Sequence, residues 1–173
     1  MAVVDTRRDD RLVGLATIFA IAVLVHNFDH LRRGGSAVST DVFWIGTLAI
    51  VDEVAVVVLV YVRHPWAAFA SLVSGVSLAA GYVFVHFTPR RTWLSDSLVG
   101  GHASALSVFA ASLETFAALA LAAGAFLILR RPRIESATPQ LPPAATTRTW
   151  THPVVLAMVL GNAIVLAGSL LTR

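Results

Sequence analysis

Two long stretches of this chain carry no charged side chain, and they constrain its fold more than any other feature. Residues 66–87 and 154–171 contain no Asp, Glu, Lys or Arg. At a rise of about 1.5 Å per residue, helices of this length match the roughly 30 Å hydrocarbon core of a bilayer. Only 13% of the 173 residues are charged, whereas charged residues make up about a quarter of soluble domains. We therefore expect an integral membrane protein.

Five apolar segments are long enough to cross a bilayer as helices, and they lie at residues 12–31, 42–62, 66–87, 103–129 and 154–171. We predict an all-α fold, a polytopic bundle of about five transmembrane helices. Turn-forming and polar residues separate the segments, as expected for helices that reverse direction at the membrane surface.

The chain divides into a four-span part and a single later span. Residues 1–131 hold the four spans of the predicted bundle core. Residues 132–151 are rich in Pro, Thr and Ala, a composition typical of a linker, and residues 152–173 hold the fifth span. Between the third and fourth spans we expect a short interfacial helix at about residues 92–99, with Trp93 at the level of the lipid headgroups.

Arginine placement predicts the orientation of the bundle. Cytoplasmic loops of membrane proteins carry an excess of basic residues, and a cytoplasmic N-terminus puts eight of the thirteen arginines inside and five outside. We therefore expect a multi-pass protein of the cell membrane with its N-terminus in the cytoplasm. The inner arginines are Arg7, Arg8, Arg11, Arg63, Arg130, Arg131, Arg133 and Arg148, and the outer ones are Arg32, Arg33, Arg90, Arg91 and Arg173.

The positive net charge does not indicate nucleic-acid binding. The formal charge is only +3, and the arginines lie at the ends of apolar segments, as membrane topology requires. The expected partner is the lipid bilayer, and a homo-oligomer or a larger membrane complex is compatible with the pattern.

The first span ends in a cluster of ionisable side chains. His26, Asp29 and His30 are spaced i, i+3, i+4, which places all three on one face of a helix. Two imidazoles one turn apart can chelate a cation, with Asp29 as a further ligand or as a group that orients a ligand. The same spacing also suits a hydrogen-bonded helix end, so the cluster alone does not establish a metal site.

Two more histidines fall at the same membrane face. His86 lies at the outer end of the third span and His102 at the outer start of the fourth, so four of the six histidines gather there. This group predicts a divalent metal, Zn or Fe, or alternatively haem b held between two imidazoles. Histidines at the membrane interface also form hydrogen bonds with lipid headgroups and water, so a protein without any cofactor fits the pattern equally well.

Three carboxylates lie deeper in the spans and form a candidate acid–base tier. Asp52 and Glu53 interrupt the second span near its middle, and Glu114 interrupts the fourth. A carboxylate at the bilayer centre costs several kcal/mol unless it is paired, protonated or faces a cavity. Neighbouring helical residues point about 100° apart, so Asp52 and Glu53 cannot both face one partner. By helical rise, only His26 is deep enough to contact either of them.

The outer arginine pairs are candidates for anion binding. Arg32 and Arg33 follow the first span, and Arg90 and Arg91 follow the third. Guanidinium groups beside a metal or acid–base cluster suit a phosphate or carboxylate on a substrate, and lipid headgroups would satisfy them equally well.

No motif in the chain points to a reaction. The absence of cysteine excludes disulfides, thiolate metal ligands and cysteine nucleophiles. There is also no HExxH motif and no serine nucleophile framed by glycines.

Three classes of function remain open. The first is a metal-binding membrane enzyme that acts on an amphiphilic substrate from the outer leaflet, with the histidines as ligands and Glu53 or Glu114 as the acid–base group. The second is a non-catalytic membrane subunit or scaffold whose polar residues serve helix packing. The third is a component of a proton- or cation-coupled carrier that uses Asp52, Glu53 and Glu114.

Overall fold

A computed structural model of the chain describes residues 6–34, 37–89, 93–99, 103–130 and 152–172, with side chains from residue 10 onward. These parts contain five helices and no strand: α1 (Thr6–Arg33), α2 (Thr40–Tyr61), α3 (Ala67–Phe87), α4 (Ala105–Leu129) and α5 (Pro153–Leu171). Each helix is long and apolar enough to cross a membrane. The predicted all-α bundle of about five spans is therefore confirmed, and the predicted linker at 132–151 lies outside the described residues.

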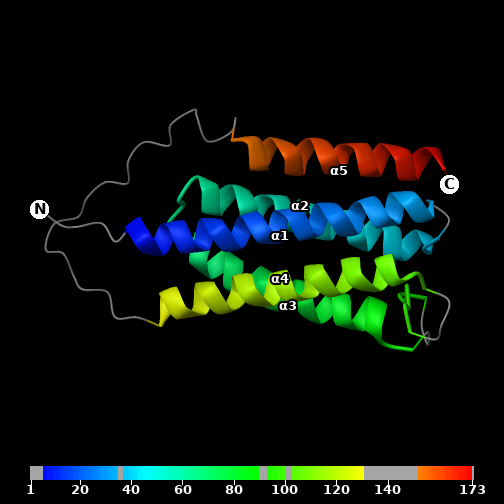
Figure 1. The fold of residues 1–173 in the computed structure, drawn as a ribbon, viewed down its shortest axis with the longest axis horizontal. Helices are drawn as coiled ribbons and strands as arrows, with labels where there is room; N and C mark the ends of the chain where they lie inside the picture. The colour runs from blue at the N-terminus through cyan, green and yellow to red at the C-terminus, as the bar shows by residue number, and fades with distance from the viewer. Residues whose placement is uncertain (1–5, 35–36, 90–92, 100–102, 131–151, 173) are drawn as a thin grey trace, which may run out of the picture.

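The first four helices form an antiparallel bundle, and α5 packs on its outside (Figure 1). Consecutive helices alternate in direction, and α1 closes the ring by packing against α4 as well as α2. The fifth helix runs parallel to α1 and contacts α1 and α2. In this arrangement α1 and α2 each touch three other helices.

Local sequence explains where the helices begin and end. Gly34 follows α1 with a positive φ of 89°, a conformation that glycine adopts without strain. Ser39 and Ser104 cap α2 and α4, since each side-chain oxygen accepts a hydrogen bond from a backbone N–H in the first turn. The imidazole of His152 does the same for α5, and Pro153 occupies its first turn.

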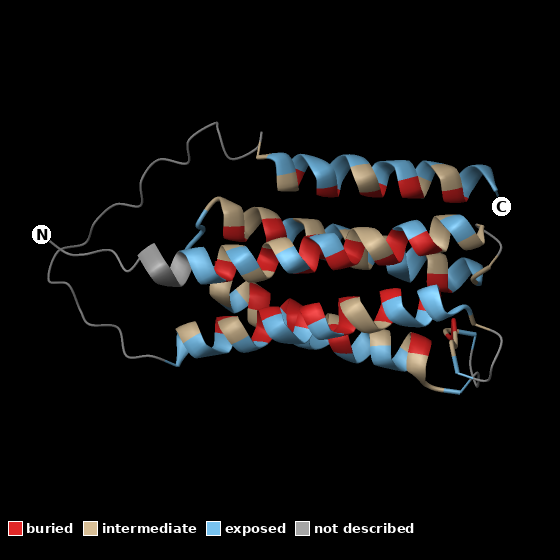
Figure 2. Ribbon diagram, viewed as in Figure 1, coloured by how far each residue is buried: buried red, intermediate tan, exposed pale blue. Residues whose placement is uncertain are grey.

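Small residues let the helices of the core approach closely. A Cβ atom on Gly75 of α3 would lie 2.7 Å from the carbonyl oxygen of Ala118 and 2.9 Å from Cβ of Ala122, both in α4. Such close contacts drive the association of helices in lipid. Lipid tails are as apolar as the helix surface, so burying that surface against another helix gives no gain by itself. Figure 2 shows buried residues along the inner faces of the helices and exposed residues outside. The exposed faces are rich in large apolar side chains, as expected for contact with lipid.

The predicted interfacial helix is wrong. Of the predicted range, the structure describes residues 93–99, and these are not helical. Instead, this segment folds back on the end of α3, where the N–H groups of Asp96 and Leu98 donate to the carbonyl oxygens of Val85 and His86 at 3.1 and 2.8 Å. These hydrogen bonds satisfy carbonyl groups at the helix end, which a separate helix would leave open.

Candidate metal centre

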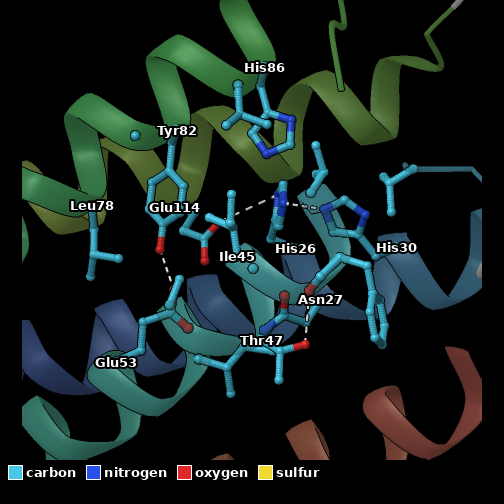
Figure 3. Close-up of a pocket in the computed structure, with 18 of the residues that line it drawn as sticks. His26, Asn27, His30, Ile45, Thr47, Glu53, Leu78, Tyr82, His86 and Glu114 are labelled. Atoms are coloured by element: carbon cyan, nitrogen blue, oxygen red, sulfur yellow. Dashed lines mark hydrogen bonds and ion pairs between the residues drawn. The ribbon is translucent and has the colours of Figure 1, made fainter. Parts of the chain in front are cut away.

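Three histidines from two helices meet near one end of the bundle. His26 and His30 lie one turn apart on α1, and His86 lies in the last turn of α3. One nitrogen from each ring lies within 4.8 Å of the other two, an arrangement that could hold a metal ion. The ring centroid of His26 is 4.6 Å from that of His30 and 4.8 Å from that of His86 (Figure 3).

One of these imidazoles has a second partner that orients it, and another lies close to a carboxylate. Nδ1 of His86 lies 3.2 Å from the carbonyl oxygen of Asp96, so this nitrogen donates and Nε2 is left to face the cluster. Nδ1 of His26 points toward Oε2 of Glu114 at 3.5 Å. Metal-binding histidines commonly donate their second N–H to a carbonyl or carboxylate in this way, which sets the ring orientation and the tautomer.

His30 has a different partner and therefore a different tautomer. Nδ1 of His30 lies 2.9 Å from Nη2 of Arg33. Because a guanidinium can only donate, this nitrogen accepts, and the ring proton resides on Nε2. Nε2 of His30 lies 2.8 Å from Nε2 of His26, to which it donates. In this state His30 has no free lone pair facing the cluster, so metal binding through Nε2 requires the proton to move to Nδ1, which breaks the hydrogen bond from Arg33.

The Nε2 atoms of His26 and His30 lie close to the separation that a shared metal ion would need. Zinc–nitrogen bonds of about 2.0–2.1 Å at a tetrahedral angle place two ligand nitrogens roughly 3.4 Å apart. The 2.8 Å separation between His26 and His30 must therefore grow by only about half an ångström. Three imidazole ligands would leave at least one coordination position for water or substrate, as in catalytic rather than structural sites.

Arg32 and Arg33 form ion pairs within the protein. Arg33 lies between two carboxylates, 3.2 Å from Asp29 and 2.6 Å from Asp96. Arg32 also binds Asp29, at 2.7 Å, and donates to hydroxyl groups at the start of α4. The predicted role of these arginines in binding headgroups or anions stays a prediction, and Arg33, with a side chain 18% exposed, is less accessible than Arg32 at 48%. Asp29 supports the cluster through the arginines and is not part of the histidine group.

The deep carboxylates separate into two different environments. Glu53 and Glu114 are 2% and 1% exposed and face the interior of the bundle. Asp52 is exposed and accepts a hydrogen bond from Ser74 of α3 at 3.0 Å, although it lines the same cavity as the other two. As the helical geometry required, the two neighbouring acids of α2 do not share a partner. His26 contacts Glu114 rather than Asp52 or Glu53, because α4 lies next to α1.

Tyr82 is a site residue that the sequence reasoning missed. Its hydroxyl donates to Oε1 of Glu53 and also interacts with Glu114, so it joins the two buried acids. Tyr82 lies one turn before His86 on the same face of α3, a spacing that could have identified it. A polar chain therefore runs from Arg33 through His30, His26, Glu114 and Tyr82 to Glu53.

The histidines and the buried acids line one cavity of about 320 Å³. Its walls come from all five helices, with α2 and α3 supplying most of the apolar lining. Figure 3 shows His26, His30, Tyr82, His86 and Glu114 around it. Oε2 of Glu53, Oε2 of Glu114 and Nδ1 of His26 are buried and have no hydrogen-bond partner among the described residues. Two of these atoms, Nδ1 of His26 and Oε2 of Glu114, face each other at 3.5 Å.

Several predicted site residues lie outside the described parts of the chain. They are His102, Arg90 and Arg91. Their predicted roles stay predictions.

The chain matches no protein-family model, no curated protein and no solved structure. Any functional assignment therefore rests on the geometry of the site itself.

Proposed function

We propose that this protein binds a divalent metal ion, Zn²⁺ or Fe²⁺, through His26, His30 and His86. The observation that carries the proposal is the approach of one nitrogen from each ring to within 4.8 Å of the others, at buried or half-buried positions. Imidazole suits both zinc and iron, and three such ligands with an open position are typical of catalytic metal sites. The carbonyl partner of His86 and the Glu114 carboxylate 3.5 Å from His26 support the same proposal.

A single ion fits this geometry better than haem b. The two axial imidazoles of a haem lie on opposite sides of a planar macrocycle. His26 and His30 project from one face of α1 with their ring centroids 4.6 Å apart, and His26 is in edge contact with His86 at 4.8 Å. These distances suit convergent ligands around one small cation.

The metal-binding enzyme is the class of function that the surrounding groups favour. A metal ion bound there would acidify a coordinated water or polarise a substrate oxygen. Glu114 lies beside His26 and has an unpartnered oxygen, so it is the proposed acid–base group. With a cytoplasmic N-terminus in the cell membrane, the site lies in the outer half of the bilayer, where an amphiphilic substrate is accessible.

Elemental analysis of the purified protein tests the metal site. Protein in detergent, loaded with Zn²⁺ or anaerobically with Fe²⁺ and then desalted, is expected to retain about one ion per chain. Replacing His26, His30 or His86 by Asn should reduce this to less than a tenth, with the helical circular dichroism unchanged. His64→Asn is a matched control, because His64 lies in the turn between α2 and α3 at the other end of the bundle. Equal metal retention by the control and the three variants would contradict the proposal.

Proton transfer is the second candidate, and the part of the polar chain from His30 to Glu53 favours it. Each link is a hydrogen bond or a close contact between groups that can exchange protons. Reconstituted in vesicles, the wild-type protein would then dissipate a pH gradient, and Tyr82→Phe would slow this by at least tenfold by breaking the chain. No difference between wild-type and empty vesicles would exclude this function.

A further inference from the structure

Three small residues contribute to the lining of the cavity between α2 and α3. Ser77 and Gly81 on α3 line the cavity and are exposed, so the cavity reaches the surface of the bundle between these helices. Gly46 on α2 also lines it and shares a face with Glu53, two turns away. A Cβ atom added to Gly46 or Gly81 would meet nothing within 4 Å. Unlike Gly75, these glycines do not allow close packing, and they leave space instead.

This opening lies at membrane depth. Gly46 and Gly81 are each six residues from the nearer end of their helix, about 9 Å along the axis. Both helices are candidate membrane spans, so the gap faces hydrocarbon rather than water. Deeper in the bundle, a hydrogen bond between Ser74 and Asp52 joins α3 to α2.

The size and polarity of the cavity limit what can occupy it. Its volume of about 320 Å³ is at the lower end of the roughly 300–1,000 Å³ found for small-molecule sites. One hydrocarbon chain of moderate length fits such a volume, and a lipid with two acyl chains does not. The histidines and buried acids line one part of the cavity, and apolar residues such as Ile45, Leu78 and Val85 line the part between α2 and α3.

We propose that the gap at Gly46 and Gly81 is a lateral portal through which a single-chain amphiphile enters from the bilayer. Its polar head group reaches the histidines, and its apolar chain lies between α2 and α3. The head-group part of this inference rests on the proposed metal site, whereas the chain-binding part rests on the cavity alone. The two parts can therefore fail separately.

A pair of hydroxamates tests the portal in protein loaded with Co²⁺ and reconstituted in phosphatidylcholine nanodiscs. Acetohydroxamate offers only a metal-chelating head, and dodecanohydroxamate adds an apolar chain; binding is followed by the visible absorption of cobalt. We expect dodecanohydroxamate to bind the wild-type protein at least tenfold more tightly. Gly46→Leu and Gly81→Leu should abolish this advantage without changing the cobalt content or the affinity for acetohydroxamate. Gly14→Leu is the matched control, since Gly14 also faces open space but lies outside the cavity.

An unchanged advantage of the long chain in Gly46→Leu and Gly81→Leu would overturn the portal. If the protein binds no cobalt, the metal site is wrong, and chain binding is tested by itself with a dodecanol that carries a diazirine at its tail. Photolabelling of α2 and α3 should then fall at least fivefold in Gly81→Leu but not in Gly14→Leu. Labelling spread evenly over the lipid-facing helices would overturn the proposal.

Discussion

Nδ1 of His26 lies 3.5 Å from Oε2 of Glu114, and both atoms are buried. Among the described residues neither atom has a hydrogen-bond partner that satisfies strict geometry. A small movement of either side chain completes a carboxylate–histidine pair, with Nε2 of His26 facing His30 and His86. The pair therefore links the deep acids to the candidate metal ligands.

Replacing Glu114 by Gln should weaken metal binding without unfolding the protein. The amide is a weaker partner for the His26 N–H than a carboxylate, and losses of about 10- to 100-fold are typical when such partners of a ligand are changed. Affinity is measured by competition with a coloured chelator. Asp52→Asn is the control, because Asp52 lies at similar depth but bonds to Ser74. Similar affinities for the two variants would show that Glu114 does not act on the metal.

Replacing Arg33 by Gln should tighten metal binding by about tenfold, or roughly 1.4 kcal/mol. Arg33 donates to Nδ1 of His30 and so holds the proton on the nitrogen that must bind the metal. Its positive charge also repels a cation, and its removal frees the charge of Asp29 and Asp96. The chelator competition used for Glu114 measures the change. Arg32→Gln should have a smaller effect, because Arg32 binds Asp29 and not His30; weaker binding by Arg33→Gln would contradict this account.

Replacing Gly75 by Ala should destabilise the packing of α3 on α4. The new methyl group would lie 2.7 Å from a backbone oxygen of α4, which cannot move aside as a flexible side chain would. Overpacking of this kind costs typically 1–3 kcal/mol. Unfolding by SDS titration in mixed micelles measures the loss. Gly14→Ala, on an open face of α1, should be neutral or slightly stabilising, and an equal response of the two variants would refute the close contact.

The amide pair Asn27–Asn162 should attach α5 to the bundle. Nδ2 of Asn27 donates to Oδ1 of Asn162 at 2.7 Å, and both residues are buried. A double-mutant cycle with Ala at each position should give a coupling free energy of about 0.6–2 kcal/mol, the range found for hydrogen bonds between membrane helices. The same SDS titration supplies the four free energies. A coupling near zero would mean that apolar packing alone holds α5.

Single cysteines can test the predicted orientation, because the chain has none of its own. Trp66 lies in the turn before α3, and Val99 lies beyond its other end, so the two positions are on opposite sides of the membrane. Both side chains are exposed, at 62% and 53%. On intact cells, a membrane-impermeant maleimide should label Val99→Cys but not Trp66→Cys. The reverse pattern would place the N-terminus outside.

The sequence alone was sufficient to predict the membrane spans and the helical faces within them. A helix in lipid satisfies its backbone hydrogen bonds within the segment, so the length of an apolar run decides locally whether it can span. The same locality made the i, i+4 relation of His26 and His30 predictable. Helical geometry also required the neighbouring residues Asp52 and Glu53 to point in different directions. It did not predict the segment after α3, because residues 93–99 take their shape from hydrogen bonds to the end of that helix.

Only the tertiary structure decided which side chains meet. The rotation and depth of each helix depend on close packing with its neighbours, as at Gly75 against α4, and no local pattern records them. This packing brings His86 to the pair on α1 and places Glu114, rather than Glu53, beside His26. It also puts Tyr82 between the two acids. The sequence supplied the chemical groups, and the packing of α1 against α3 and α4 brought them together as a candidate site.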